Sequence, residues 1–181
     1  MTVAGGTSYD LPHRSAEAIQ LYLSHGELMP HRHRSKHFWI TAGFLTVSLP
    51  ILLLGQTLGL IDYPQAVQLG LQESVDQVSA YGVQVNRAFA AADTFVYIPL
   101  MVASLIGLYQ RKPWSMVTLA AVGGISVYWS ITVGVMLLML EGVPGQLLEA
   151  GISYLLFIGI YTVFGVWSLY VAVCHPDQLL Q

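Results

Sequence analysis

Charged residues are scarce in this sequence, because only 9% of its 181 residues are Asp, Glu, Lys or Arg. A soluble domain carries about 25%. Hydrophobic residues make up 55% of the chain. This imbalance excludes an ordinary soluble domain and indicates an all-α integral membrane protein.

Cysteine is almost absent. The single Cys174 excludes an internal disulfide and a CxxC redox pair. The sequence also lacks a nucleophile elbow, a phosphate-binding Gly-rich loop and an HExxH motif. Its two halves share no pattern that would indicate a transporter built from inverted repeats. We therefore predict no catalytic residue.

Histidine is missing from every apolar stretch, which argues against a transmembrane bis-His haem. His33 and His37 are four residues apart and form a weak candidate metal site. Arg and Lys alternate with these histidines, so we interpret the run as a basic anchor at the membrane interface. No cofactor is predicted.

The first 37 residues contain no apolar core of the kind found in a signal peptide. We interpret residues 1–37 as a cytoplasmic N-terminal extension. Ser15 is a candidate cap for a short helix from Ala16 to about Ser24. The extension ends in the basic and His-rich run directly before the first span.

Four stretches are long and apolar enough to cross a bilayer, which takes about 20 residues. They cover residues 38–61, 89–109, 116–140 and 150–174, so residues 38–174 form one transmembrane domain and 175–181 a polar tail. Pro50 and Pro99 each remove a backbone donor within a span, and we expect a kink at Pro50. A left-handed four-helix bundle is the expected architecture.

Residues 62–88 form the only long loop between spans. Apolar residues from Val67 to Phe89 recur at helical spacing, and Gln68, Glu73 and Asp76 lie on the opposite face. This pattern predicts an amphipathic extracytoplasmic helix, with a possible break at Gly82, that leads into the second span.

Lys and Arg are sorted along the chain. With a cytoplasmic N-terminus, only Arg87 lies outside, and all the others lie inside: Arg14, Arg32, Arg34, Lys36, Arg111 and Lys112. The positive-inside rule then predicts that both termini are cytoplasmic. We expect a multi-pass protein of a bacterial cytoplasmic membrane.

Asp93 lies just inside the second span, on a helical stripe with Asn86, Tyr97, Ser104 and Arg111. A carboxylate in hydrocarbon costs about 2.5–3.5 kcal/mol at the helix centre, so this stripe should avoid lipid. Asp93 is a structural anchor, a ligand-binding group or a proton carrier. Arg87 is six residues away and lies on a different face.

Several other polar residues within or beside the spans are candidates for a shared pocket. The alternative for the tyrosines is interhelical hydrogen bonding, at about 0.6 kcal/mol per pair. The candidates are Gln56, Asn86, Arg87, Asp93, Tyr97, Tyr128, Ser130, Tyr154 and Tyr161. Small residues also predict close helix packing, at Gly123, Ser126, Ser130, Gly134 and Gly165.

Two functions remain open. We favour an accessory or assembly subunit of a membrane complex, or a self-associating bundle, whose partners are the bilayer and other membrane chains or itself. The alternative is a small-molecule-binding membrane enzyme or transporter with an outward-opening pocket around Asp93, whose ligand could be a lipid or another hydrophobic small molecule. The basic residues lie close to the membrane and give no support to a nucleic-acid partner.

Overall fold

A computed structural model describes residues 34–143 and 151–180. Within these ranges the chain is helical and has no strand. Two predicted features lie outside the described residues: the helix from Ala16 to about Ser24, and the part of the basic run that includes His33.

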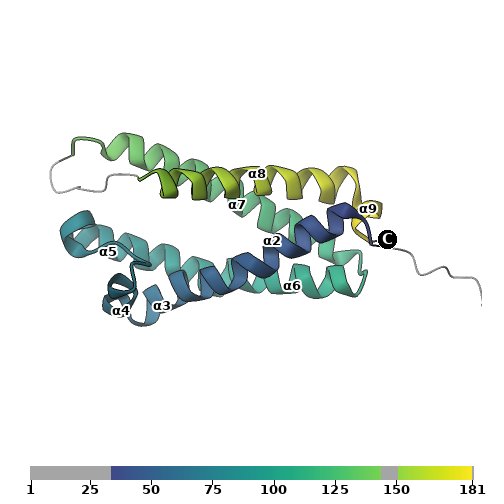
Figure 1. The fold of residues 1–181 in the computed structure, drawn as a ribbon, viewed down its shortest axis with the longest axis horizontal. Helices are drawn as coiled ribbons and strands as arrows, with labels where there is room; N and C mark the ends of the chain where they lie inside the picture. The colour runs from purple at the N-terminus through teal and green to yellow at the C-terminus, as the bar shows by residue number, and fades with distance from the viewer. Residues whose placement is uncertain (1–33, 144–150, 181) are drawn as a thin grey trace, which may run out of the picture. The chain divides into compact units, whose positions relative to one another are not determined.

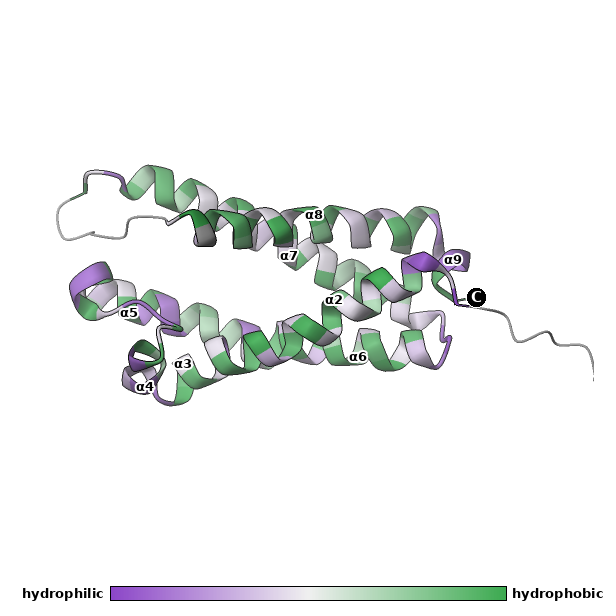
Figure 2. Ribbon diagram, viewed as in Figure 1, coloured by the Kyte–Doolittle hydropathy of each residue, from purple (hydrophilic) through white to green (hydrophobic). Residues whose placement is uncertain are grey.

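Four helical segments are long and apolar enough to cross a membrane, which confirms the number predicted from sequence. They are Lys36–Ile61, Val75–Tyr109, Trp114–Leu140 and Tyr154–Cys174. Their outer faces are apolar, and only 22–33% of the most apolar part of each segment is buried within the chain. Such surfaces fit a multi-pass membrane protein (Figure 2).

The first two spans each contain a π-helical segment. The first span consists of α2 (Lys36–Leu52), η1 (Leu53–Thr57) and α3 (Leu58–Ile61). The second consists of α5 (Val75–Ala92), η2 (Asp93–Tyr97) and α6 (Ile98–Tyr109). The third and fourth are α7 (Trp114–Leu140) and α8 (Ile152–Cys174). Two short helices complete the described chain, α4 (Tyr63–Gln68) and α9 (Pro176–Leu180).

The loop after the first span differs in detail from its prediction. The amphipathic segment belongs to α5, which continues into η2 and α6. A capping box between Ser74 and Gln77 starts it. The break lies at Ser79, where φ is 63°, and not at Gly82. The helix continues through Gly82, whose N–H faces the Ser79 hydroxyl at 3.4 Å.

The most extensive helix contacts join α7 to α8, and others join α6 to α7 and α2 to α6 (Figure 1). Two glycines bring α7 and α8 together. A Cβ placed on Gly123 would lie 2.9 Å from the Gly165 carbonyl oxygen, and one on Gly165 would lie 2.8 Å from that of Gly123. Only glycine permits this backbone approach. The small-residue contact therefore joins two helices of the same chain.

One end of the bundle carries Arg34, Lys36, Arg111 and Lys112, and we call it the basic end. The residues after the last span are not a simple polar tail there, because they form α9, which packs on α2. Leu179 of α9 is fully buried, and the Ser35 hydroxyl donates to the Gln178 carbonyl. Burial of Leu179, with Leu180 packed against the same core, thus holds the segment in place.

Arg34 reinforces the basic end. Its guanidinium lies 4.1 Å from the centre of the Phe38 ring and 4.9 Å from that of Tyr109. It also donates to the Tyr109 carbonyl at 2.9 Å. These contacts tie the start of α2 to the end of α6.

Candidate ligand-binding pocket

The two π-helical segments lie against each other in the middle of the bundle. The hydroxyls of Thr57 in η1 and Thr94 in η2 are 3.1 Å apart. Pro99 accounts for η2, because it offers no N–H to the Phe95 carbonyl four residues earlier. The helix widens there, and the Ile98 N–H bonds to the Asp93 carbonyl. Such π-turns are frequent at functional sites.

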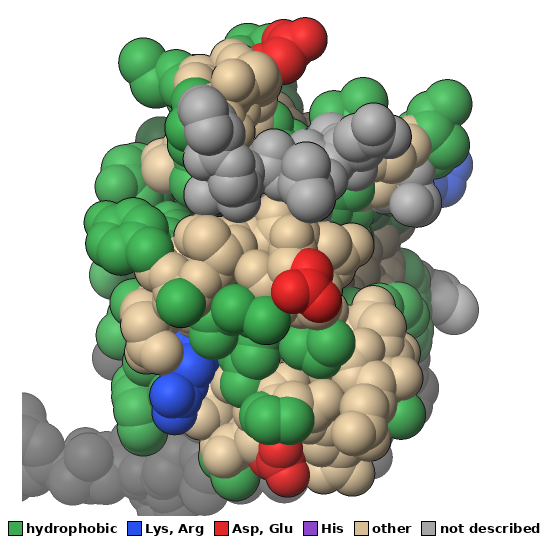
Figure 3. Space-filling model, turned by 90° about the vertical axis from the view of Figure 1, so that its left-hand side faces the viewer, with side chains coloured by type: hydrophobic (Ala, Val, Ile, Leu, Met, Phe, Trp, Pro, Cys, Tyr) green, Lys and Arg blue, Asp and Glu red, His purple; other side chains and the backbone are tan. Residues whose placement is uncertain are grey.

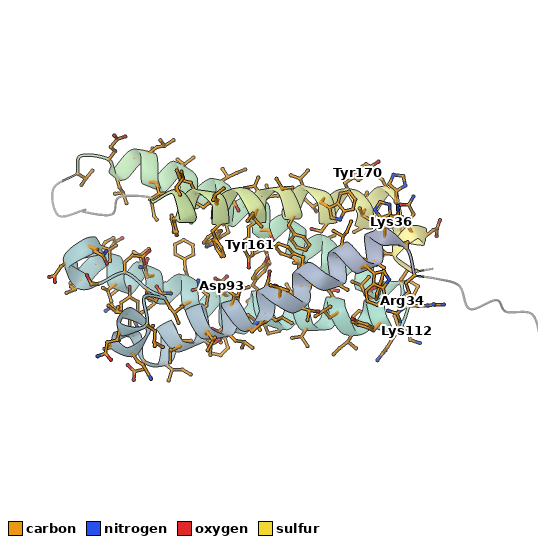
Figure 4. All side chains as sticks on the ribbon, in the orientation of Figure 1. Arg34, Lys36, Asp93, Lys112, Tyr161 and Tyr170 are labelled. Atoms are coloured by element: carbon orange, nitrogen blue, oxygen red, sulfur yellow. The ribbon has the colours of Figure 1, made fainter. Side chains whose placement is uncertain are left out.

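An inner cavity of about 20 Å³ lies beside these two turns. That volume is enough for about one water molecule. Asp93 lines it and is only 8% exposed, and Tyr161 reaches it from α8 and is 5% exposed. Figure 4 shows both residues far along the bundle from the labelled cations Arg34 and Lys112. The other lining residues are Leu52, Gln56, Tyr97, Ile125, Ser126, Trp129 and Phe157.

The Asp93 carboxylate has no hydrogen bond or ion pair to any residue within 34–143 and 151–180. The nearest cation in sequence, Arg87, instead points toward α3 and donates to the Leu60 carbonyl at 3.4 Å. The Asn86 side chain also bonds to another residue, because it donates to the Glu73 carboxylate. A buried charge without a partner costs several kcal/mol. Asp93 is therefore the residue that most needs a partner from outside the described residues.

The two tyrosines beside Asp93 differ in how they are satisfied. The Tyr97 and Ser126 hydroxyls are 2.6 Å apart, and Ser126 also donates to the Val122 carbonyl. The Tyr161 hydroxyl faces Ser48 but forms no hydrogen bond of normal geometry within the described residues. The cavity therefore presents a carboxylate and a hydroxyl that are both available to a further group.

A second, wider cavity of about 340 Å³ continues from the inner one, and we call it the mouth. Leu52, Gln56, Trp129 and Phe157 line both cavities. The mouth lies toward the end opposite the basic end. Figure 3 faces this acidic end, where Asp and Glu side chains lie among apolar ones. The residues found only in its lining include Gln72, Glu73, Asn86, Phe89 and Tyr154.

Hydrogen bonds fix the polar side of the mouth. Gln72 donates to the Gly55 carbonyl in η1 at 3.0 Å. Asn86 donates to Glu73 Oε2 at 2.8 Å and faces the Tyr63 hydroxyl at 3.1 Å. Burial raises the pKa of Tyr63, an effect that the Asn86 hydrogen bond opposes and the Glu73 charge increases. The loop before α5 is thereby folded back over the end of the first span.

The predicted residues fall into separate groups. Asp93, Tyr97, Tyr161 and Gln56 line the inner cavity, while Asn86 and Tyr154 line the mouth. Tyr128 is 69% exposed on the outer surface. Arg87 and Ser130 line neither cavity, and the Ser130 hydroxyl is buried without a hydrogen-bond partner among the described residues.

The packing residues also divide. Gly123 and Gly165 are in contact, and Ser126 is buried beside them. Gly134 has open space where a Cβ would be.

Sequence reasoning missed Glu73, Trp129 and Phe157 as pocket residues. Glu73 was assigned to the exposed face of a loop helix, and its approach to Asn86 depends on how that loop folds back. Trp129 and Phe157 look like ordinary span residues. The one signal in the sequence was that both residues are large aromatics within spans. In the structure their rings lie 5.9 Å apart, edge to face.

Metal ligands do not gather in the described part of the chain, where no group of three or more His, Cys, Asp or Glu side chains is found. His37 stacks on Trp167 with ring centres 5.1 Å apart.

The chain matches no protein-family model, and comparisons with curated proteins and with solved structures give no significant match.

Proposed function

We propose that this membrane protein binds a small molecule in the pocket formed by the mouth and the inner cavity, as an enzyme or a transporter would. The observation that supports this best is the unpaired Asp93 carboxylate at the inner end of an open cavity. A carboxylate is costly to bury without a partner inside the protein, and a bound ligand would supply that partner. We take the basic end to be cytoplasmic, in a bacterial inner membrane, so the mouth opens outward.

Purification of the full chain in its native lipids, followed by mass spectrometry, tests this proposal. We expect a stoichiometric small molecule with the wild type, and its loss from Asp93→Asn, which keeps the size of the side chain. Glu141→Gln is the matched control, because Glu141 is exposed and lines neither cavity. If wild type and Asp93→Asn carry the same molecules, or none, in equally folded protein, the proposal is wrong.

An accessory or self-associating subunit is the second candidate. It is favoured by an apolar groove of about 670 Å³ between α2 and α8, lined by residues such as Ile40, Phe44, Leu156 and Ile160. A further transmembrane helix would fit such a surface as well as lipid does. Co-purifying membrane chains, or a dimer that Ile160→Trp abolishes, would support this function.

A further inference from the structure

We infer that the pocket takes an aliphatic diamine: one ammonium group beside Asp93, an alkyl chain along the apolar walls, and a second ammonium group beside Glu73. This inference rests on the proposed function and names the class of ligand. It follows from two carboxylates placed at the two ends of adjoining cavities with apolar walls between them.

The inner cavity favours an ammonium group over other cations. Its volume of about 20 Å³ admits a group the size of one water molecule, which excludes a quaternary ammonium. An NH₃⁺ group has three donors, and the acceptors there are the Asp93 carboxylate, the Tyr161 hydroxyl and the Gln56 amide. Aromatic rings of Tyr97, Trp129 and Phe157 complete the wall and favour a cation.

Hard metal ions fit this cavity less well. Ca²⁺ and Mg²⁺ take six or more oxygen ligands, several of them carboxylates. One carboxylate is present in the inner cavity, and no cluster of three ligating side chains occurs in the described residues.

The walls between the two carboxylates suit an alkyl chain. They consist largely of Leu52, Phe89, Trp129, Met136 and Phe157. Methylene groups that enter them are removed from water, and each group buried favours binding. A sugar or a peptide would leave its polar groups unpaired along such walls.

Glu73 supplies the second charge. It is half-buried in the lining of the mouth, where the Asn86 amide donates to one of its oxygens at 2.8 Å. No Lys or Arg lines either cavity, so the negative charge is not neutralised there. Asn86 precedes Asp93 by seven residues, a rise of roughly 10 Å along a helix. An alkyl diamine can span this rise between Asp93 and the residue that bonds to Glu73, whereas a single ammonium group cannot.

Titration calorimetry on the full chain in lipid nanodiscs tests the inference with a series of α,ω-diaminoalkanes. The matched probes are the monoamine and the α,ω-diol of each length. We expect a diamine of intermediate length to bind about fivefold to tenfold more tightly than its monoamine, and the diol not to bind. Asp93→Asn should weaken the diamine about 30-fold or more. Glu73→Gln should weaken only the diamine, to the level of the monoamine, and Glu141→Gln should change nothing.

The outcomes separate the two proposals. Equal binding of diamines and monoamines, or indifference to Glu73→Gln, would overturn the diamine inference. If no amine binds but a co-purified molecule is lost from Asp93→Asn, the inference is wrong and the pocket is still a ligand site. Tyr161→Phe gives a second variant should Asp93→Asn fold poorly. It should weaken every amine and leave the preference for diamines intact.

Discussion

The two ends of the bundle are built differently, although both are helical and both carry charged residues. At the basic end, Arg34 bridges α2 and α6, α9 covers the helix ends, and Leu179 is fully buried. At the acidic end, two adjoining cavities separate α5 from α7 and α8, and the buried Asp93 has no partner. The comparison shows that the helices pack tightly at the basic end, whereas the acidic end encloses two cavities.

The largest effect should come from the glycines of α7. Gly123→Ala places a methyl group 2.9 Å from the Gly165 carbonyl and should lower the free energy of unfolding by about 1–3 kcal/mol. Gly134→Ala, on the same helix, meets open space and should be neutral or stabilise by up to about 1 kcal/mol. Thermal unfolding in detergent measures both. Equal losses would show that α7 is packed alike along its length.

Accessibility of introduced cysteines should show the same contrast. In a Cys174→Ser background, Gln56→Cys lies on the wall shared by the two cavities, whereas Ser104→Cys replaces a fully buried residue of α6. A water-soluble thiol reagent should modify the first at least about tenfold faster than the second. Mass spectrometry of timed samples gives the rates. Similar rates would mean that the cavities are closed to water.

Loss of the Arg34 charge should loosen the basic end. Arg34→Met keeps much of the side-chain length but removes the contact with Phe38 and Tyr109, and should cost about 1 kcal/mol. Lys36→Met is the control, because Lys36 is exposed. Hydrogen exchange of the start of α2 and the end of α6 should increase in the first variant only. Increased exchange in α5 instead would place the effect at the acidic end and would contradict this prediction.

The smallest effect is expected for Tyr97→Phe, which removes the 2.6 Å contact between the Tyr97 and Ser126 hydroxyls. Hydrogen bonds between membrane helices contribute about 0.6 kcal/mol on average, and Ser126 keeps its bond to Val122. Tyr128→Phe, at a 69% exposed position, should change nothing. Chemical unfolding of the two variants side by side resolves the difference. A loss above about 2 kcal/mol would mean that Tyr97 supports more than this one contact.

The sequence predicts the helices well because the requirement is local: about 20 apolar residues must follow one another to cross a bilayer. Asp93 was identifiable for the same reason, since one carboxylate in an apolar stretch is conspicuous wherever its helix packs. Which groups surround it depends on tertiary structure. Glu73 and Asn86 meet only because the loop folds back, and Tyr161 reaches the cavity from a helix far along the chain.

Two features could not be predicted from composition. The π-turn η2 depends on how backbone hydrogen bonds shift near Pro99, whereas the hydropathy pattern of the span gives no sign of it. The C-terminal helix was mistaken for a polar tail because it offers only two neighbouring leucines, Leu179 and Leu180, and their packing depends on the rest of the bundle.

The widened turn at η2 decides where the second span tolerates a change in length. It accommodates one residue more per turn than a regular helix does. Loss of one residue within η2 would let the turn close to a regular helix, so α5 and α6 would keep their relative orientation. Loss of one residue from α5 between Asn86 and Asp93 would instead rotate Asn86 by roughly 100° relative to Tyr97. The rim of the pocket would then be separated from its floor, although the hydropathy of the span would be almost unchanged.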